Sequence, residues 1–418
     1  MPTYVGVLTF ISKFLYGVTE RGTQLFLFKP YNDKIPEFIV ACSKCFNANQ
    51  IALISTELGD ITLRLTMGSK RPRGNLLHLF GSVGDIDAEK KALLFHYGSP
   101  VAFKHMKSLI DTSFDGHRIE ISAATGWCVY HVGAASSQAI AYHPETRETA
   151  ITISDASISS ENDAYVKARG MTFYNLDGTV EMPMMHDGTL KVGTRARGLT
   201  LIIDSTGIET LILSWITVAR QFTEEEYDGP AAMNELLFER YNAAILHHLN
   251  GAGIYRYTNP IDSVWCLLDK RLNIAIQEAA HYTEAYSEGS TCSAIDPLNN
   301  YADLVNQRIV KHVITWRPNT EDCSSIAIHM NERMQANRLW LHDLTLLTKV
   351  VPGHIHTVNV MWLDNELIWI PEWLRVIKAR HSRPIHPDTS EPVLYDRVIL
   401  VCDMSKPSWK TRVITTRA

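Results

Sequence analysis

The sequence has few cysteines and no long uncharged apolar run. Seven cysteines in 418 residues are too few for a disulfide framework, and an odd number is typical of a reducing compartment. No run of eighteen or more apolar residues is free of charged side chains, so no membrane-spanning helix is predicted. The first 22 residues lack a basic segment followed by an unbroken apolar core, so we predict no signal peptide. We expect an intracellular, cytoplasmic protein that does not bind a membrane.

Neither sign of charge dominates the chain. Lys and Arg number 40 against 45 Asp and Glu, which gives a formal net charge of -5. This balance disfavours a strongly basic protein that wraps nucleic acid, but it does not exclude a local basic strip. Hydrophobic residues make up 45% and charged residues 20%, which are the proportions of a globular protein with a substantial core. Global disorder and a collagen-like or coiled-coil fold are excluded.

Catalytic, nucleotide-binding and metal-binding motifs are also scarce. The sequence contains no GxSxG elbow, no P-loop and no HExxH motif. Cys42 and Cys45 form a lone CxxC without the further ligands that structural zinc needs. His354 and His356 lie on one face of a predicted strand, and we interpret them as surface residues. No metal site is therefore predicted, and no cofactor.

Three regions with different sequence patterns follow one another along the chain. Residues 1–92 contain five or six short β runs separated by turns, enough for a small OB-type barrel. Residues 93–347 mix strands with longer helices, as in an α+β domain. Residues 348–418 return to short β runs and have the size of a second small barrel. We predict the longer helices at residues 232–249, 264–286, 301–314 and 325–350.

A helix is also predicted to begin at Asp85. Asp87 and Glu89 follow within the first turn, where carboxylates are favoured electrostatically. These three acids could in principle hold magnesium, but we interpret them as helix-capping residues.

Cations and tryptophans occur together in the last barrel. OB barrels hold single strands with aromatic side chains beside cations that track the phosphates. This pattern favours contact with RNA. The alternative is ordinary surface charge, with the tryptophans packed in the core. The residues of the strip are Trp369, Trp373, Arg375, Lys378, Arg380, Arg383, Lys406, Trp409, Lys410 and Arg412; Arg64, Lys70, Arg71 and Arg73 form a smaller group in the first barrel.

Several blocks, in order, resemble the ribonuclease II/R exoribonucleases, the RNB-domain family. The most specific is DPLNNYADLVNQR at 296–308, and ISDASIS at 153–159 and ARGMTFYNLDGTVEMPM at 168–184 are similar to further family segments. The resemblance implies an RNB-type α+β core (93–347) between an N-terminal cold-shock-like OB barrel (1–92) and a C-terminal S1-like OB barrel (348–418).

The sequence departs from this family at the positions that would carry catalysis. In the family, an aspartate-rich signature before the segment at 153–159 holds magnesium, which activates water for 3′–5′ hydrolysis. The corresponding stretch, 129–140, contains no acid, and the signature falls on Gly133–Gln138. The family's tandem arginines fall on Asn299 and Asn300, which lack the charge and the fork of a guanidinium. We therefore predict no catalytic residue and no Mg²⁺ requirement, unless residual nuclease activity remains.

Three functional hypotheses remain open. The first is a pseudoenzyme reused as a structural or assembly component with protein partners in a large complex or virion. The second is a single-stranded RNA-binding module without hydrolysis, and the third is a residual Mg²⁺-dependent 3′–5′ exoribonuclease. The negative net charge and the missing arginines place the structural role slightly ahead.

If the chain binds RNA, we expect the contacts to come from the last barrel and from the segment that matches the family's active centre. Arg308 is a candidate there, although a helix-surface or core-lining arginine is the preferred interpretation, and core packing is an equal alternative for Tyr174. The full candidate set is Tyr174, Arg308, Trp369, Trp373, Arg375, Lys378, Arg380 and Lys410.

Overall fold

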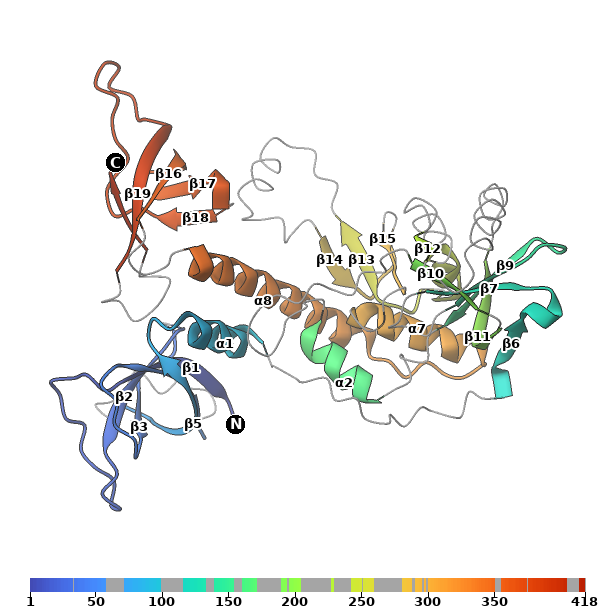
Figure 1. The fold of residues 1–418 in the computed structure, drawn as a ribbon, viewed down its shortest axis with the longest axis horizontal. Coiled ribbons are helices and arrows are strands. Elements are labelled where there is room, and N and C mark those ends of the chain that lie inside the picture. Colours follow the sequence, from blue (N-terminus) through green and yellow to red (C-terminus); the bar gives the residue numbers. More distant parts are fainter. Residues whose placement is uncertain are drawn as a thin grey trace.

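A computed structural model describes the fold over most of the chain (Figure 1). The residues that the structure describes are 1–32, 34–57, 71–98, 116–132, 139–153, 160–170, 189–193, 195–203, 227–228, 242–249, 251–258, 280–287, 290–294, 297, 300–349, 355–373, 375–403 and 413–417.

The N-terminal strands close into a small barrel, as the β runs predict. Its strands pair in the order β1-β2-β3-β5-β4, and β4 returns to β1. Large apolar side chains such as Phe28 and Phe38 fill the interior and are fully buried. The strands are β1 (Thr3–Thr9), β2 (Leu25–Pro30), β3 (Phe38–Ala41), β4 (Gln50–Ser55) and β5 (Arg73–Ser82).

Helix α1 (Ile86–Tyr97) follows the barrel and begins where the sequence predicts. The Asp85 side chain accepts hydrogen bonds from the backbone N–H groups of Asp87 and Ala88, which satisfies donors that the first turn leaves open. Glu89 is buried and accepts the Gly84 N–H at 2.9 Å. The capping interpretation is therefore confirmed for Asp85, and Glu89 binds the turn before the helix, whereas Asp87 is exposed in the first turn and pairs with Lys90 at 3.8 Å.

The central part is built on a seven-stranded sheet with the order β12-β10-β7-β8-β9-β11-β6. A smaller sheet beside it has the order β14-β13-β15. The strands of the large sheet are β6 (Ile119–Ser122), β7 (Cys128–Val132), β8 (Ala139–His143), β9 (Glu148–Ile153), β10 (Thr189–Gly193), β11 (Arg195–Ile203) and β12 (Tyr227–Asp228); those of the small sheet are β13 (Tyr255–Thr258), β14 (Ala280–Thr283) and β15 (Ser290–Thr291).

Helices α2 (Ser160–Arg169), α7 (Tyr301–Ile314) and α8 (Cys323–Lys349) share a buried apolar cluster with strands of these sheets. The bounds of α7 match the predicted helix at 301–314. The helix predicted at 264–286 is wrong at its end, because Ala280–Thr283 forms β14 and pairs with β13. Residues 264–279 lie outside the described part of the chain.

The C-terminal strands form a five-stranded antiparallel sheet with the order β18-β17-β16-β19-β20. Among the described residues β18 and β20 do not pair, so the part of this unit that the structure describes is an OB-like half-barrel, which agrees with the small OB-like unit that the sequence predicts. Its elements are β16 (Ile355–Trp362), β17 (Leu367–Ile370), the short 3-10 helix Pro371–Trp373, β18 (Arg375–Lys378), β19 (Tyr395–Cys402) and β20 (Val413–Arg417).

The long helix α8 joins the parts of the molecule (Figure 1). The N-terminal barrel and the C-terminal sheet both lie near its C-terminal end, and the large sheet lies toward its other end. A buried cluster that includes Val5 of β1, Leu93 of α1 and Trp340 of α8 connects the barrel to the long helix. The chain thus has an α+β core flanked by two OB-like units, and no helix within the described residues is long and apolar enough to cross a membrane.

Candidate nucleic-acid interface

The C-terminal sheet has one buried face and one exposed face. The buried face is apolar, and its side chains come from alternate positions of β16, β17 and β19: Val358, Val360, Trp362, Ile368, Ile370, Val398 and Leu400. Because successive side chains of a strand point to opposite faces, the intervening residues lie on the outer face. We call this surface the outer face of the C-terminal sheet.

Two aromatic residues and a methionine form a row across the outer face. Met361 of β16 is paired with Trp369 of β17 on one side and with Tyr395 of β19 on the other. Cross-strand partners project from the same face and contact one another, so the three side chains lie in one line. Tyr395 is 70% exposed, and Trp369 is half-buried. The row offers an aromatic surface on which planar groups can stack.

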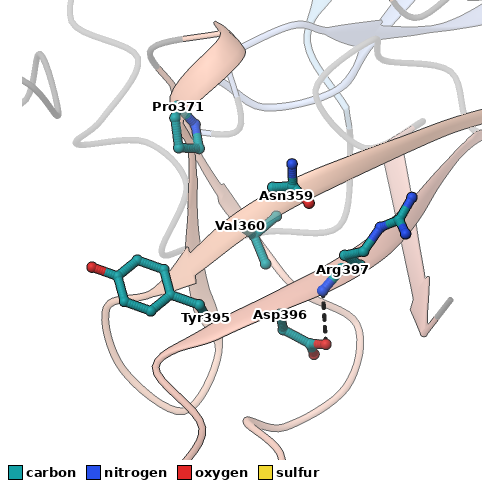
Figure 2. Close-up of a pocket in the computed structure, with 6 residues that line it drawn as sticks. All are labelled: Asn359, Val360, Pro371, Tyr395, Asp396 and Arg397. Atoms are coloured by element: carbon teal, nitrogen blue, oxygen red, sulfur yellow. Dashed lines mark hydrogen bonds between the residues drawn. The ribbon is translucent and has the colours of Figure 1, made fainter.

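A cavity of about 310 Å³ opens beside this row (Figure 2). It is lined by Asn359, Val360, Pro371, Tyr395, Asp396 and Arg397. Asn359 and Arg397 face each other across β16 and β19. Within the described residues, neither side chain has a hydrogen-bond or ion-pair partner, so a donor-acceptor pair and a cation stand open next to the row.

The predicted cations of this region differ in the groups that they bind within the protein. Lys378 forms an exposed ion pair with Glu366 at 2.7 Å, and the hydrogen bond to Glu366 and its negative charge raise the pKa of Lys378. An exposed pair of this kind is weak and can exchange for a phosphate. Arg380 is exposed, and its backbone N–H donates to Thr415 Oγ1 at 2.7 Å. Arg383 instead donates to the backbone oxygens of Val393 and Pro392 and fixes the local loop.

The remaining predicted contacts are placed differently. Trp373 is half-buried, lies edge-on to His356 with ring centroids 5.6 Å apart, and packs against two core clusters. Arg375 is on β18, but its side chain lies outside the described part. Tyr174 and Lys410 also lie outside the described residues. Their contacts with RNA stay predictions.

In the first barrel, the smaller basic group is described only in part. Arg71 pairs with Glu37 at 2.9 Å, and its guanidinium lies 5.9 Å from the centre of the Tyr16 ring. Arg64 and Lys70 lie outside the described residues. Arg71 is therefore partly neutralised, whereas Arg73 at the start of β5 is exposed and forms no ion pair among the described residues.

The segment that resembles the family's active centre surrounds the start of α7. Asn300 is the N-cap of this helix, and its side chain accepts the Ala302 N–H at 3.0 Å. It also hydrogen-bonds Tyr282, whose pKa burial raises to about 12. Asn299 and Gly133–Gln138 lie outside the described residues. Asn300 therefore serves the helix and a neighbouring strand.

Arg308 is held between two carboxylates. It forms ion pairs with Asp163 of α2 at 2.8 Å and with Glu321, which precedes α8, at 2.6 Å. Burial alone would lower the pKa of this guanidinium, but the charges of Glu321 and Asp163 raise it above its ordinary value. Arg308 thus links α7 to α2 and to the segment before α8, and its contact with RNA stays a prediction.

The other polar side chains of the segment also bind the protein itself. The buried Asn306 accepts the Ile254 N–H and donates to the oxygens of Ile254 and Ser293. Gln307 donates to the Ala294 oxygen at 2.6 Å, and Asp303 accepts from the Ser293 hydroxyl at 2.8 Å. These bonds fasten α7 to Ile254 before β13 and to the segment that follows β15, and they explain why polar residues occupy the buried side of this helix.

The described residues do not offer the ligand set that the family's magnesium needs. No group of three or more His, Cys, Asp or Glu side chains in that part of the chain could hold a metal ion. Gly133–Gln138, where the family's acidic signature falls, lie outside it, and this sequence contains no carboxylate. Cys42 is buried and Cys45 is exposed, and both are free thiols.

Sequence reasoning missed Asn359, Met361, Tyr395 and Arg397. A signal for them exists, because residues 355–362 alternate between buried Val358, Val360 and Trp362 and the positions between them. This period of two assigns Asn359 to the exposed face. The pairing of β16 with β19, which places Arg397 opposite Asn359, joins segments about forty residues apart and is not readable from local pattern.

Comparison with known proteins finds one family model for the N-terminal unit and solved structures with the same fold. Residues 25–98 match the sequence model of the Dis3-like cold-shock domain 2. No curated protein matches the chain significantly in sequence. The matched residues cover four strands of the barrel and α1, so the N-terminal unit is similar to a cold-shock domain of that group.

The similarity extends to the whole architecture. The apo form of RNase R from Mycoplasma genitalium aligns with 100% of this chain and 89% of its own, at 13% identity and a TM-score of 0.54. The chain shares the fold of RNase R. The same enzyme in complex with ribose-methylated single-stranded RNA gives a TM-score of 0.52 at 13% identity, covering 100% of this chain and 89% of that one. Yeast Ssd1, described as a pseudonuclease, covers 96% of this chain and 67% of its own at 12% identity, with a TM-score of 0.45.

Proposed function

We propose that this chain is a catalytically degenerate RNase R-like protein that holds single-stranded RNA on the outer face of its C-terminal sheet without hydrolysing it. The observation that carries the proposal is the row of Trp369, Met361 and Tyr395 beside the open cation of Arg397. Bases stack on aromatic rings while cations track the phosphates, and this combination binds single strands on OB folds without sequence preference. RNase R, with the same fold, has been solved with single-stranded RNA, which supports the proposal.

The absence of hydrolysis is argued from the residues that would replace the family's catalytic groups. The stretch 129–140 contains no acid, and Asn300 supplies no charge. Arg308, the nearest described arginine of the segment, is already neutralised by Asp163 and Glu321. A site without metal ligands and without a charged clamp stabilises neither the attacking water nor the developing phosphate charge.

A binding assay with Tyr395→Ala tests the proposal. Stacking on one aromatic side chain contributes about 1–3 kcal/mol per base, so we expect the variant to bind a fluorescent ten-nucleotide RNA at least about fivefold more weakly. Ile385→Ala, which removes an equally exposed apolar side chain from a loop, is the matched control and leaves the affinity unchanged. Equal affinities for wild type and Tyr395→Ala would contradict the proposed site.

A role in assembly is the second proposal, and one surface favours it. The loop at 10–24 between β1 and β2 exposes Ile11, Phe14, Leu15 and Val18, and Leu15 is 87% exposed. Asn49 Oδ1 accepts the N–H groups of residues 10 and 11, both at 3.0 Å, and so fixes the base of the loop. Exposed apolar patches of this kind mark protein contacts.

We propose that a second copy of the chain binds this loop. The resulting dimer would be the unit of a larger complex or virion. Lys13 lies between Ile11 and Phe14, Glu20 follows Val18, and no ion pair among the described residues uses either charge. Two loops packed antiparallel would pair Lys13 of one copy with Glu20 of the other. Light scattering during gel filtration should show a dimer that the double variant Phe14→Ser, Leu15→Ser converts to a monomer, whereas Ile385→Ser does not. A monomeric wild type at all concentrations contradicts this proposal.

We also propose the division into 1–92, 93–347 and 348–418 as three domains. Helix α1 spans residue 92 and α8 ends at Lys349, so both boundaries fall within helices that the units share.

A further inference from the structure

The cavity beside Tyr395 has the size of a small ligand site. Its volume of about 310 Å³ lies at the lower end of the range in which ligand pockets fall, roughly 300–1,000 Å³. A single nucleobase with its ribose fits such a volume better than a large cofactor does. The ring of Tyr395 and the ring of Pro371 border it from two different elements, β19 and the 3-10 helix after β17 (Figure 2).

The cavity carries a polar group suited to reading a base edge. The side-chain amide of Asn359 presents a donor and an acceptor side by side. Figure 2 shows Asn359 on β16 and Arg397 on the neighbouring β19, both directed to the same side of the sheet. The only hydrogen bond between lining residues in Figure 2 joins the Arg397 backbone N–H to Asp396 Oδ1 at 2.8 Å, and it leaves the Asn359 amide and the Arg397 guanidinium open.

We propose that this cavity holds one base of a bound RNA strand and that Asn359 reads it, with adenine preferred. The inference rests on the proposed RNA binding and adds a base preference to it. Adenine offers the N7 acceptor and the N6 donor together, and an asparagine amide meets both with two hydrogen bonds. Arg397, on the same face, is left to bind the adjoining phosphate.

The preference separates this site from a plain stacking surface. A row of aromatic rings binds every base because each base has a flat face. A paired hydrogen bond to a base edge discriminates, and it does so only while the Asn359 amide is present. Tyr395 and Asn359 should therefore differ in what their removal changes: the affinity for all strands in one case and the preference in the other.

Fluorescence anisotropy at one salt concentration tests the inference with labelled RNAs of ten adenosines, ten uridines or ten cytidines, and a ten-adenosine strand with one central guanosine. We expect wild type to bind the adenosine strand about fivefold or more tightly than the uridine and cytidine strands. Asn359→Ala should lower the adenosine affinity to the uridine level and leave the uridine affinity unchanged. Thr357→Ala, also exposed on the outer face of β16, is the matched control and keeps the preference.

The outcomes separate the two proposals. Equal binding of all strands, or a preference that survives in Asn359→Ala, overturns the base-reading site and leaves the RNA-binding function standing. Tightest binding of the strand with guanosine also overturns it, because Arg397 would then be the reading residue. No binding of any strand overturns both. Because Asn359 is exposed, we expect wild type and Asn359→Ala to have equal melting temperatures. Equal values would show that the substitution acts on binding and not on folding.

Discussion

Arg308 shows how a motif residue can be held by the protein's own carboxylates. Its ion pairs reach Asp163 on α2 and Glu321 before α8, and all three side chains are mostly buried. Removal of the guanidinium leaves two negative charges without their partner in a partly desolvated site. The residue is therefore a stabilising link between helical segments, and its charge is not open to a phosphate.

We expect Arg308→Ala to lower the free energy of unfolding by about 1–3 kcal/mol, because two charge-assisted contacts are lost and two carboxylates remain. Arg308→Lys keeps the charge but not the fork, and should recover part of the loss. Urea unfolding measures the stability, and anisotropy with labelled RNA should show an unchanged affinity. A variant of full stability that has lost RNA binding would show that Arg308 contacts the RNA.

The buried hydroxyl of Tyr282 makes the stability of the fold depend on pH above pH 10. Burial, together with the charge of Asp303, raises the pKa of its hydroxyl from 10.0 to about 12. Between these values the unfolded chain loses this proton and the folded chain keeps it, so the stability present below pH 10 falls as the pH rises toward 12. The fall amounts to up to about 2–3 kcal/mol from this one group.

Tyr282→Phe should make the loss of stability between pH 10 and 12 shallower, as measured by urea unfolding at several pH values. Tyr286→Phe, at a tyrosine with a largely exposed side chain, is the control and should leave the slope unchanged. Identical slopes for wild type and both variants would show that the Tyr282 hydroxyl does not keep its proton in the fold.

At the scale of elements, the sequence predicts those that carry their own local signals. Helix α7 begins at its asparagine cap and helix α1 at Asp85, and both are found where they are expected. β14 could not be predicted in this way, because residues 280–283 become a strand through pairing with β13 in another part of the chain. The aromatic row is unpredictable for the same reason, since Trp369 and Tyr395 meet only through the register of β17, β16 and β19.

Gly170 is the point where three helices meet. It ends α2 with φ of +70°, and its oxygen accepts the Tyr301 N–H at the start of α7. A Cβ added there would lie 2.8 Å from Arg333 Cβ of α8. Gly251 has a similar φ of +87°, but nothing lies within 4 Å of an added Cβ.

We therefore expect Gly251→Ala to cost about 1–2 kcal/mol from backbone strain alone, and Gly170→Ala to cost more because the clash adds to the same strain. Thermal unfolding of the two variants under one condition measures the difference. Equal losses would show that α2 and α8 have room to separate at this junction.

At the scale of the molecule, the two OB-like units and α8 share a buried cluster. Trp340 and Leu347 of α8 pack there with side chains of the barrel and α1, and Trp373 and Val413 of the C-terminal sheet contact the same cluster. Trp373 is half-buried in this contact, whereas Trp369 from the same predicted strip lies on the outer face. The composition of the strip indicated RNA contact, but only the fold separates the tryptophan that packs between the units from the half-buried one on the outer face.

One experiment tests the central claim, that the chain holds RNA and leaves it intact. The purified protein is incubated with 5′-labelled single-stranded RNA and Mg²⁺ or Mn²⁺, and the products are run on native and denaturing gels. We predict a retarded band on the native gel and full-length RNA on the denaturing gel, with retardation that weakens as salt is raised because bound phosphates regain their counterions. Stepwise shortening of the RNA that EDTA blocks, or intact RNA that migrates freely, would contradict the account.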